Sequence, residues 1–366
     1  MKRFRTSFFL VFLLGLSVQS FAQIRKYSNE FLAIGVGARS LAMSGASVAS
    51  ADDVTSGYWN PAGLLGVKPD FQVGLQHAEY FASIAKYDYL GFAGKIDSAS
   101  SFGFSVLRFA VDDIPNTTQL IDPSGNINYD NITTFSAQDY AFLISYARKA
   151  PIAGLHYGAN VKIIRRKVGD FAGAWGFGLD AGAQYDYKGW RLGAVVRDVT
   201  STFNAWSFNL SQDMKDVFAA TGNEIPQNSL ELTMPRLIFG ASKTYPVGRQ
   251  QKFSVGGEMD FINTFDGKRN VLVRTGLWSM EPVLGLEAGF KNIIFLRTGI
   301  GNIQKSKDVF GKDVTTFQPN LGVGLRIKSL TIDYAFTDIG NQSVALYSNI
   351  FSLKIDINKK KIPGGS

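Results

Sequence analysis

The feature of the sequence that most constrains the fold is an alternation, every second residue, between apolar and small or polar side chains. In residues 175–185 the odd positions are Trp, Phe, Leu, Ala, Ala and Tyr, whereas the even positions are Gly, Gly, Asp, Gly and Gln. Successive side chains of a β-strand point to opposite faces, so this segment predicts a strand with one apolar and one polar face. The alternation recurs in segments of about ten residues, which is typical of a transmembrane β-barrel, although a soluble sandwich can also show it.

The N-terminus has the form of a secretory signal peptide, which we assign to residues 1–22. Lys2, Arg3 and Arg5 precede a short apolar run, and residues 20–22 (Ser-Phe-Ala) form a cleavage site. The alternative is a retained anchor, but the run is too short to cross a bilayer. No other segment has about 18 consecutive apolar residues, so we expect no transmembrane helix. The chain has no cysteine, which excludes disulfides and cysteine-ligated metals.

The lengths of the connections indicate how the strands are arranged. We predict fourteen strands, at residues 70–79, 84–95, 101–112, 136–148, 152–166, 173–186, 189–198, 231–243, 251–262, 281–290, 293–302, 316–328, 330–337 and 346–357. The long connections, at residues 113–135, 199–230, 263–280 and 303–315, all fall at one end. Outer-membrane barrels have long external loops and short periplasmic turns. We therefore predict an all-β fold, a transmembrane antiparallel β-barrel of about 14 strands over residues 70–358, followed by a periplasmic tail at 359–366.

The alternation also predicts which side chains face the lipid and which face the lumen. Apolar residues such as Tyr157, Val255 and Leu325 are expected to contact lipid. The expected lumen charges have both signs, and they either cross-link a plugged interior or line a water path: Lys162, Asp180, Glu258, Asp260, Arg297, Arg326, Asp333 and Lys354. We favour cross-linking, because buried charges must be paired to be tolerated.

One predicted strand changes phase. Large apolar residues occupy positions 102, 104 and 106 and then positions 107, 109 and 111, so the alternation slips by one residue between Val106 and Leu107. Such a slip normally needs a β-bulge or a kink. The two interpretations are a harmless bulge and an opening in the barrel wall, and an unbroken ladder on both sides of Val106 would exclude the opening.

Residues 23–69 precede the first strand and are rich in small side chains, which allow backbones to pack closely. Asp52 or Asp53 is expected to cap a short helix that continues through Tyr58. Asn60 can cap a second turn, with Pro61 at its first position, and Tyr58 and Trp59 provide apolar anchors. We predict a compact helical or irregular plug inside the barrel; the alternative is a small periplasmic appendage outside it.

This segment resembles the signature of the PorV/PorQ family, FadL-like outer-membrane proteins of the Bacteroidota. The matching pieces include residues 37–40 (Gly-Ala-Arg-Ser, with Arg39), Asp52-Asp53, and residues 58–63 (Tyr-Trp-Asn-Pro-Ala-Gly). A second match is residues 285–287 (Gly-Leu-Glu) followed by residues 296–299 (Leu-Arg-Thr-Gly). The resemblance implies a FadL-like barrel with an N-terminal plug. It also implies a role in type IX protein secretion, in which family members bind a secretion pore and carry cargo proteins, whereas other FadL-like barrels move hydrophobic molecules through a lateral opening.

The long connection at residues 199–230 contains a concentration of aromatic and methionine side chains: Phe203, Trp206, Phe208, Met214 and Phe218. Such residues on an external loop suit a protein interface, or they bury one another as the loop folds over the barrel mouth. Two functions therefore follow. The first is an accessory or shuttle that binds a secretion pore subunit or a secreted cargo protein. The second is passive transport of a hydrophobic ligand through the wall at Val106.

Several function classes are not expected. The two histidines, His77 and His156, are far apart in the sequence, so we predict no metal site. The sequence has no nucleophile elbow and no phosphate-binding loop, so we predict no enzymatic activity and no cofactor. The basic residues are scattered, and an exported barrel in contact with outer-membrane lipid is not expected to bind nucleic acid.

Overall fold

The computed structural model describes residues 29–81, 83–120, 126–307, 310–337 and 347–359. The predicted signal peptide at residues 1–22 and all but Lys359 of the predicted tail lie outside these residues.

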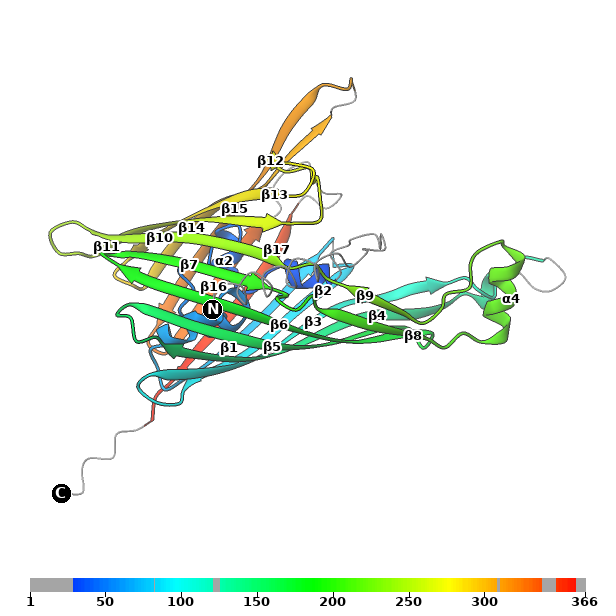
Figure 1. Cartoon of the computed structure of the whole chain (residues 1–366), viewed down its shortest axis with the longest axis horizontal. Coiled ribbons are helices and arrows are strands. Elements are labelled where there is room, and N and C mark those ends of the chain that lie inside the picture. Colours follow the sequence, from blue (N-terminus) through cyan, green and yellow to red (C-terminus); the bar gives the residue numbers. More distant parts are fainter. Residues whose placement is uncertain (1–28, 82, 121–125, 308–309, 338–346, 360–366) are drawn as a thin grey trace, which may run out of the picture.

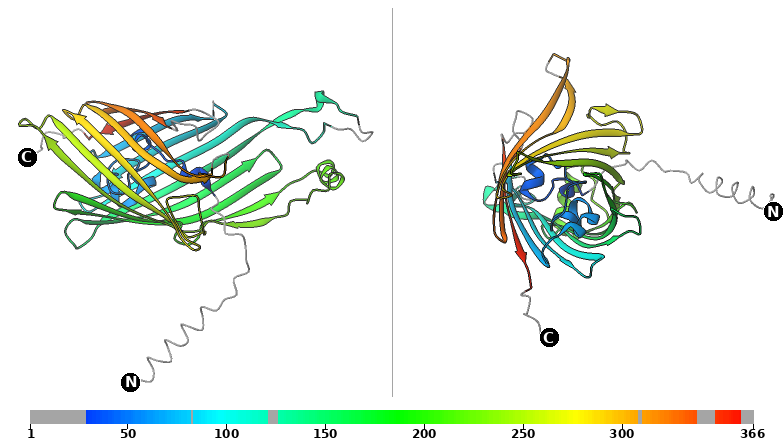
Figure 2. Two further views of the ribbon diagram at one scale, coloured as in Figure 1. Left: turned by 90° about the horizontal axis from the view of Figure 1, so that it is seen from above. Right: turned by 90° about the vertical axis from the view of Figure 1, so that its left-hand side faces the viewer.

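Fourteen strands of the described residues form a closed antiparallel ring (Figures 1 and 2). They are β1 (Phe71–Tyr80), β2 (Ala85–Lys95), β3 (Ser100–Asn116), β4 (Thr133–Lys149), β5 (Leu155–Val168), β6 (Ala172–Tyr187), β7 (Trp190–Arg197), β10 (Arg236–Val247), β11 (Phe253–Thr264), β13 (Ser279–Phe290), β14 (Ile294–Lys307), β15 (Asp313–Ile327), β16 (Leu330–Thr337) and β17 (Ser348–Ile357). The ring closes because β1 pairs with both β2 and β17. The predicted fold class is confirmed.

Two of the predicted long connections contain additional secondary structure. Residues 199–230 include β8 (Phe203–Phe208), α4 (Gln212–Ala220) and the start of β9 (Ser229–Leu232), and residues 263–280 include β12 (Val273–Arg274). β6 pairs with β7 near its C-terminal end and with β8 near its N-terminal end, and β9 pairs with β8. These connections are thus more ordered than the sequence indicated, and in residues 199–230 the reason is that β6 extends beyond β7 and offers β8 an edge to pair with.

The faces of the barrel follow the predicted alternation. Tyr157, Val255 and Leu325 are exposed on the outside, and Asn160, Lys162 and Asp333 are buried on the inside. The outer surface therefore has an apolar band that a bilayer can cover, whereas the polar groups are enclosed.

Of the two interpretations of the slip at Val106 and Leu107, neither the bulge nor the wall opening is present at that point of β3. The ladder of β3 with β2 is continuous from Ser101 to Val111, and the ladder of β3 with β4 is continuous from Ser100 to Val111. The alternation changes because the surroundings of β3 change along its length. Phe102, Phe104 and Val106 face outward within the apolar band, but beyond them the outward side chain is Arg108, which is paired with Asp88 at 3.1 Å.

The inward side chains of β3 beyond this point are apolar. Leu107 is fully buried, and Phe109 and Val111 pack against the same core cluster as Phe31. Polar residues thus face outward and apolar residues inward, which is the pattern of a sheet surrounded by water. The strand needs no bulge at the slip, because this change of faces is what we expect where a strand passes from lipid into water. The register shift of β3 against β4 lies farther along, between Val111 and Ile114.

The N-terminal segment lies inside the ring as the plug, here residues 30–69 (Figure 2). It contains η1 (Glu30–Ala33), α2 (Ala38–Ala42), α3 (Ser56–Trp59) and η2 (Pro61–Gly66), and the remaining short helix, η3 (Tyr129–Asn131), follows β3. Among the described residues, no helix is sufficiently long and apolar to cross a membrane. Inward glycines allow the plug to approach the wall closely. A Cβ atom added to Gly158 would lie 2.6 Å from the carbonyl carbon of Pro61.

Candidate functional site

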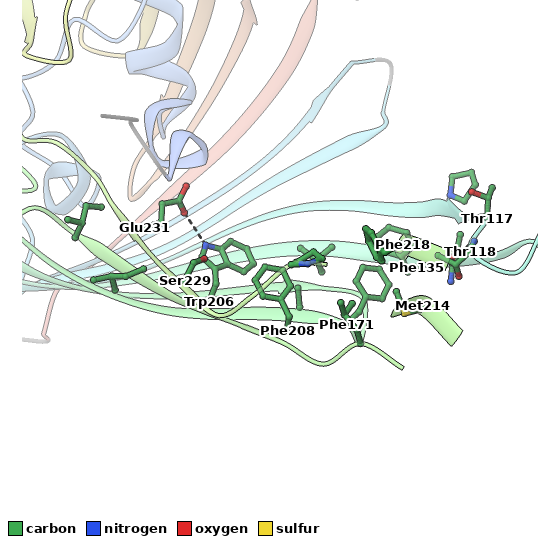
Figure 3. A pocket seen from close by; sticks show the side chains of 18 of the residues that line it. Thr117, Thr118, Phe135, Phe171, Trp206, Phe208, Met214, Phe218, Ser229 and Glu231 are labelled. Carbon is green, nitrogen blue, oxygen red and sulfur yellow. Dashed lines mark hydrogen bonds between the residues drawn. The ribbon is translucent and has the colours of Figure 1, made fainter. Parts of the chain in front are cut away.

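A largely apolar cleft of about 920 Å³, shown in Figure 3, lies at the end of the barrel that carries the long connections, which we take as the external end. Its walls come from the ends of β3 to β6 and from the segment that contains β8, α4 and β9. The apolar lining residues are Pro115, Phe135, Val168, Phe171, Ala172, Trp206, Phe208, Leu210, Met214, Phe218, Pro226, Leu230, Leu232 and Met234. We refer to this hollow as the aromatic cleft.

The aromatic rings of the cleft are held in place by specific contacts. The ring centroids of Phe135 and Phe171 are 4.9 Å apart in an edge-to-face arrangement, and those of Trp206 and Phe208 are 6.2 Å apart and stacked. The indole N–H of Trp206 donates a hydrogen bond of 3.1 Å to the carboxylate of Glu231. The Arg166 guanidinium lies 5.0 Å from the centroid of the Trp206 ring. The rings are thus positioned before any partner is present, which lowers the entropic cost of binding.

α4 covers the outer part of the cleft. The Ser211 hydroxyl caps this helix by accepting a hydrogen bond from the N–H of Met214, and Met214 and Phe218, four residues apart, lie on one face and line the cleft (Figure 3). Four of the five residues predicted as a partner-binding loop therefore line a single surface. Phe203 is the exception, because it faces outward, where its ring centroid is 6.4 Å from that of Phe177.

Two further hollows lie on either side of the plug. The external one, about 860 Å³, is lined by plug residues such as Leu41 and Trp59 and by the upper barrel wall. The periplasmic one, about 610 Å³, is lined by Arg39, Asp52 and Asp53 among others. The plug thus separates an external vestibule from a periplasmic one.

A chain of buried and half-buried ion pairs joins the plug to four strands. The Arg39 guanidinium is 2.9 Å from Glu287 of β13, which is 2.6 Å from Arg297 of β14. Arg297 is 2.7 Å from Asp333 of β16, and Lys354 of β17 is 3.7 Å from Asp333. Lys354 then lies 2.7 Å from Asp53, so the chain begins and ends in the plug. These pairings support cross-linking of the lumen rather than a water path.

The ion pairs also affect the ionisation of the plug residues. The Glu287 carboxylate raises the pKa of Arg39 above its ordinary value. Burial by itself would raise the pKa of Asp53, but the Lys354 ammonium, the hydrogen bonds from Lys354 and Thr55, and the nearby Arg39 outweigh it. The pKa of Asp53 therefore lies well below its usual range.

Two barrel carboxylates hold the middle of the plug. Asp260 accepts hydrogen bonds from the backbone N–H groups of Ser47 and Val48, and Glu258 accepts from those of Ala49 and Ser50. Gln184 completes this arrangement by donating to the carbonyl oxygens of Ala49 and Ala51. The backbone N–H and C=O groups of this irregular part of the plug thus form their hydrogen bonds with side chains of the barrel wall.

The remaining plug-motif residues also have structural contacts. Asp52 lies 3.5 Å from Arg191. Asp53 does not cap a helix as predicted; α3 begins at Ser56, and the Asp53 carboxylate instead accepts hydrogen bonds from the N–H and hydroxyl of Thr55. Asn60 caps η2, and Pro61 is the first residue of that helix.

Tyr58 and Trp59 of the plug pack against the inner wall. Their ring centroids are 4.9 Å apart, and the Arg197 guanidinium lies 4.6 Å from the centroid of Tyr58. The Trp59 indole donates to the carbonyl oxygen of Val36 at 2.8 Å. The sequence did not predict the contact of Arg197, nor the presence of Phe135 and Phe171 in the aromatic cleft. Both phenylalanines lie at strand ends remote in sequence from residues 199–230, and no local pattern indicates that they meet there.

Comparison with known proteins identifies the family. The family model described as "Type IX secretion system protein PorV" matches residues 20–204. No curated protein matches the chain.

Solved structures resemble the chain in fold. The toluene transporter TodX of Pseudomonas putida superposes with a TM-score of 0.55 at 13% identity, over 92% of this chain and 100% of TodX. The toluene transporter TbuX of Ralstonia pickettii superposes with a TM-score of 0.51 at 15% identity, over 88% of this chain and 99% of TbuX. At these identities the likeness establishes a shared barrel fold only.

Proposed function

The chain belongs to the PorV family of type IX secretion proteins, and from this we propose that it is a non-enzymatic outer-membrane barrel that binds a protein partner of secretion in its aromatic cleft. The partner is a secretion pore subunit or a secreted cargo protein. The barrel fixes the cleft at the external surface, and the plug occupies the lumen.

The observation that supports this proposal is the composition and position of the aromatic cleft. Trp206, Phe208, Met214 and Phe218 converge there from one connection, and Phe135 and Phe171 meet them from strand ends. Aromatic and methionine side chains are enriched where proteins bind one another, and preformed apolar clefts accept the anchoring side chains of a partner.

Passive transport of a hydrophobic molecule is the second candidate. The external vestibule of about 860 Å³ favours it, because plug and wall contribute apolar side chains there, including Phe31 and Ile238. The unbroken ladders at Val106 remove the route that the sequence suggested, and the ion pairs and hydrogen bonds of the plug oppose passage to the periplasm. The protein-binding function therefore has the stronger support.

The experiment is a comparison of partner recovery from native outer membranes. We expect the double variant Trp206→Ala/Phe218→Ala to lose most of the secretion pore subunit or exported protein that co-purifies with the wild type. Phe203→Ala is the matched control, because Phe203 lies in the same segment but faces outward. Equal recovery with all three proteins would contradict the proposal, and bound lipid without any protein partner would favour transport.

A further inference from the structure

β9 has an edge that no other strand of the described residues covers. Its four residues pair with β8, Ser229 opposite Trp206 and Leu232 opposite Phe203, and the sheet ends there. β12, the other short strand, differs because its segment also bridges to β14 through Val271 and Gln304.

An uncovered strand edge presents backbone N–H and C=O groups in the geometry that another strand matches. Along a strand, the backbone N–H and C=O groups of consecutive residues point to opposite edges. Two of the four residues of β9 therefore point these groups toward β8, and the other two point them toward the uncovered edge. A globular surface or a helix cannot satisfy a row of such groups, whereas an extended chain can.

The side chains beside this edge differ between the two faces of the sheet: those of β9 are apolar on the outer face and polar on the inner face, where Trp206 of β8 adds an aromatic ring. Leu230 and Leu232, 56% and 42% exposed, lie opposite Ala205 and Phe203 on the outer face. On the inner face Ser229 and Glu231 lie opposite Trp206 and Asn204, and all four residues of β9 line the aromatic cleft. The cleft therefore opens at the free edge of the strand.

We infer that the protein partner adds an extended segment to β9 as a further strand of the sheet. This inference rests on the proposed function and specifies how the partner is held. The outward residues of the added strand pack beside Leu230 and Leu232, and its inward residues enter the cleft toward Trp206 and Phe208. The segment that fits is consequently apolar at the positions beside Leu230 and Leu232.

The test measures hydrogen exchange of the β9 amides in the barrel alone and in the complex with the partner that co-purifies from native outer membranes. The expected result is that two alternate amides among Ser229–Leu232 exchange at least about tenfold more slowly in the complex, while the other two, bonded to β8, change little. A complex that forms with unchanged β9 amides overturns the inference and leaves the proposed function intact. Failure to recover any complex overturns both.

Proline variants give a second readout. Proline removes one N–H donor, and consecutive residues direct their N–H groups to opposite edges. Leu230→Pro and Glu231→Pro therefore remove N–H donors from opposite edges of β9. One of the two variants removes a donor from the free edge, and the other removes a donor from the edge that pairs with β8. We expect the variant that loses the free-edge donor to lower partner recovery at least about tenfold while the barrel keeps its heat-modifiable gel mobility. Leu230→Val, which keeps every donor, is the control. Unchanged recovery with both proline variants would overturn the inference.

Discussion

The Asp53 carboxylate of the plug accepts a hydrogen bond of 2.7 Å from the ammonium of Lys354, which lies on the strand that closes the barrel. Through Asp333, Arg297 and Glu287 the same network returns to the plug at Arg39. Charges of opposite sign alternate along this path, so each buried charge has a partner. The fixed position of the plug therefore depends on residues more than 200 positions apart in the sequence.

Removing the Asp53 charge should destabilise the protein strongly. Asp53→Asn leaves the buried Lys354 ammonium with only the longer contact to Asp333, and breaking a buried pair typically costs about 3–5 kcal/mol. Urea unfolding in detergent or lipid vesicles measures this loss. Asp170→Asn is the control, because the Asp170 side chain is 98% exposed in its pair with Lys167 and should contribute less than about 1 kcal/mol. Equal midpoints for the two variants would contradict the role of the network.

The same carboxylate should make stability depend on pH. Its pKa is lower in the folded protein than in the unfolded chain, so it stabilises the fold above the unfolded value of about 3.9. The contribution is lost as the pH falls below that value toward the folded pKa. We expect the urea midpoint of the wild type to fall below about pH 4 more steeply than that of Asp53→Asn. Parallel pH profiles of the two proteins would contradict this assignment.

The close approach of plug and wall predicts that one methyl group can disturb it. In Gly158→Ala the new Cβ would lie 2.6 Å from the carbonyl carbon of Pro61, so the backbone must move, at a cost of about 1–3 kcal/mol. The matched control is Gly257→Ala, whose Cβ would lie 3.1 Å from the end of the Leu286 side chain and in ordinary contact with the carbonyl oxygen of Gly285, at 3.7 Å. Thermal or urea unfolding should show a larger loss for Gly158→Ala, and the reverse order would be incompatible with the packing described.

The membrane boundary on β3 can be located with spin labels. The chain has no cysteine, so single cysteines at positions 106, 107 and 108 can be labelled without background. Two relaxation agents are compared, oxygen dissolved in lipid and a water-soluble agent. A label at Val106 should be accessible to oxygen and a label at Arg108 to the water-soluble agent. A label at Leu107 should be accessible to neither. A lipid-accessible label at position 108 would contradict a boundary at this level.

Much of the barrel is predictable from the sequence, because a strand between lipid and a polar lumen must alternate. The alternation located the fourteen strands and the outward position of residues such as Leu325. It failed at Val106, because we read β3 as if its surroundings were uniform along its length. Beyond Val106 the apolar side of the strand is the inward one, which is what we expect where a strand passes from lipid into water.

The aromatic cleft was predictable only in part. Trp206, Phe208, Met214 and Phe218 stand out because they are concentrated within one connection. Phe135 and Phe171 do not, because their proximity depends on how far β4 and β6 extend beyond the membrane. β9 was equally difficult to predict, because a four-residue strand carries little pattern and is defined by its pairing with β8.

The central claim is that the aromatic cleft binds a protein of the secretion pathway, and photo-crosslinking in native outer membranes tests it most directly. A benzophenone amino acid replaces Phe208 in the cleft or, as a control, Phe239, which is exposed on the lipid face of β10. We predict that position 208 crosslinks to a secretion pore subunit or an exported protein, whereas position 239 yields no such product. Protein crosslinks from position 239 alone, or only lipid adducts from both positions, would contradict the claim.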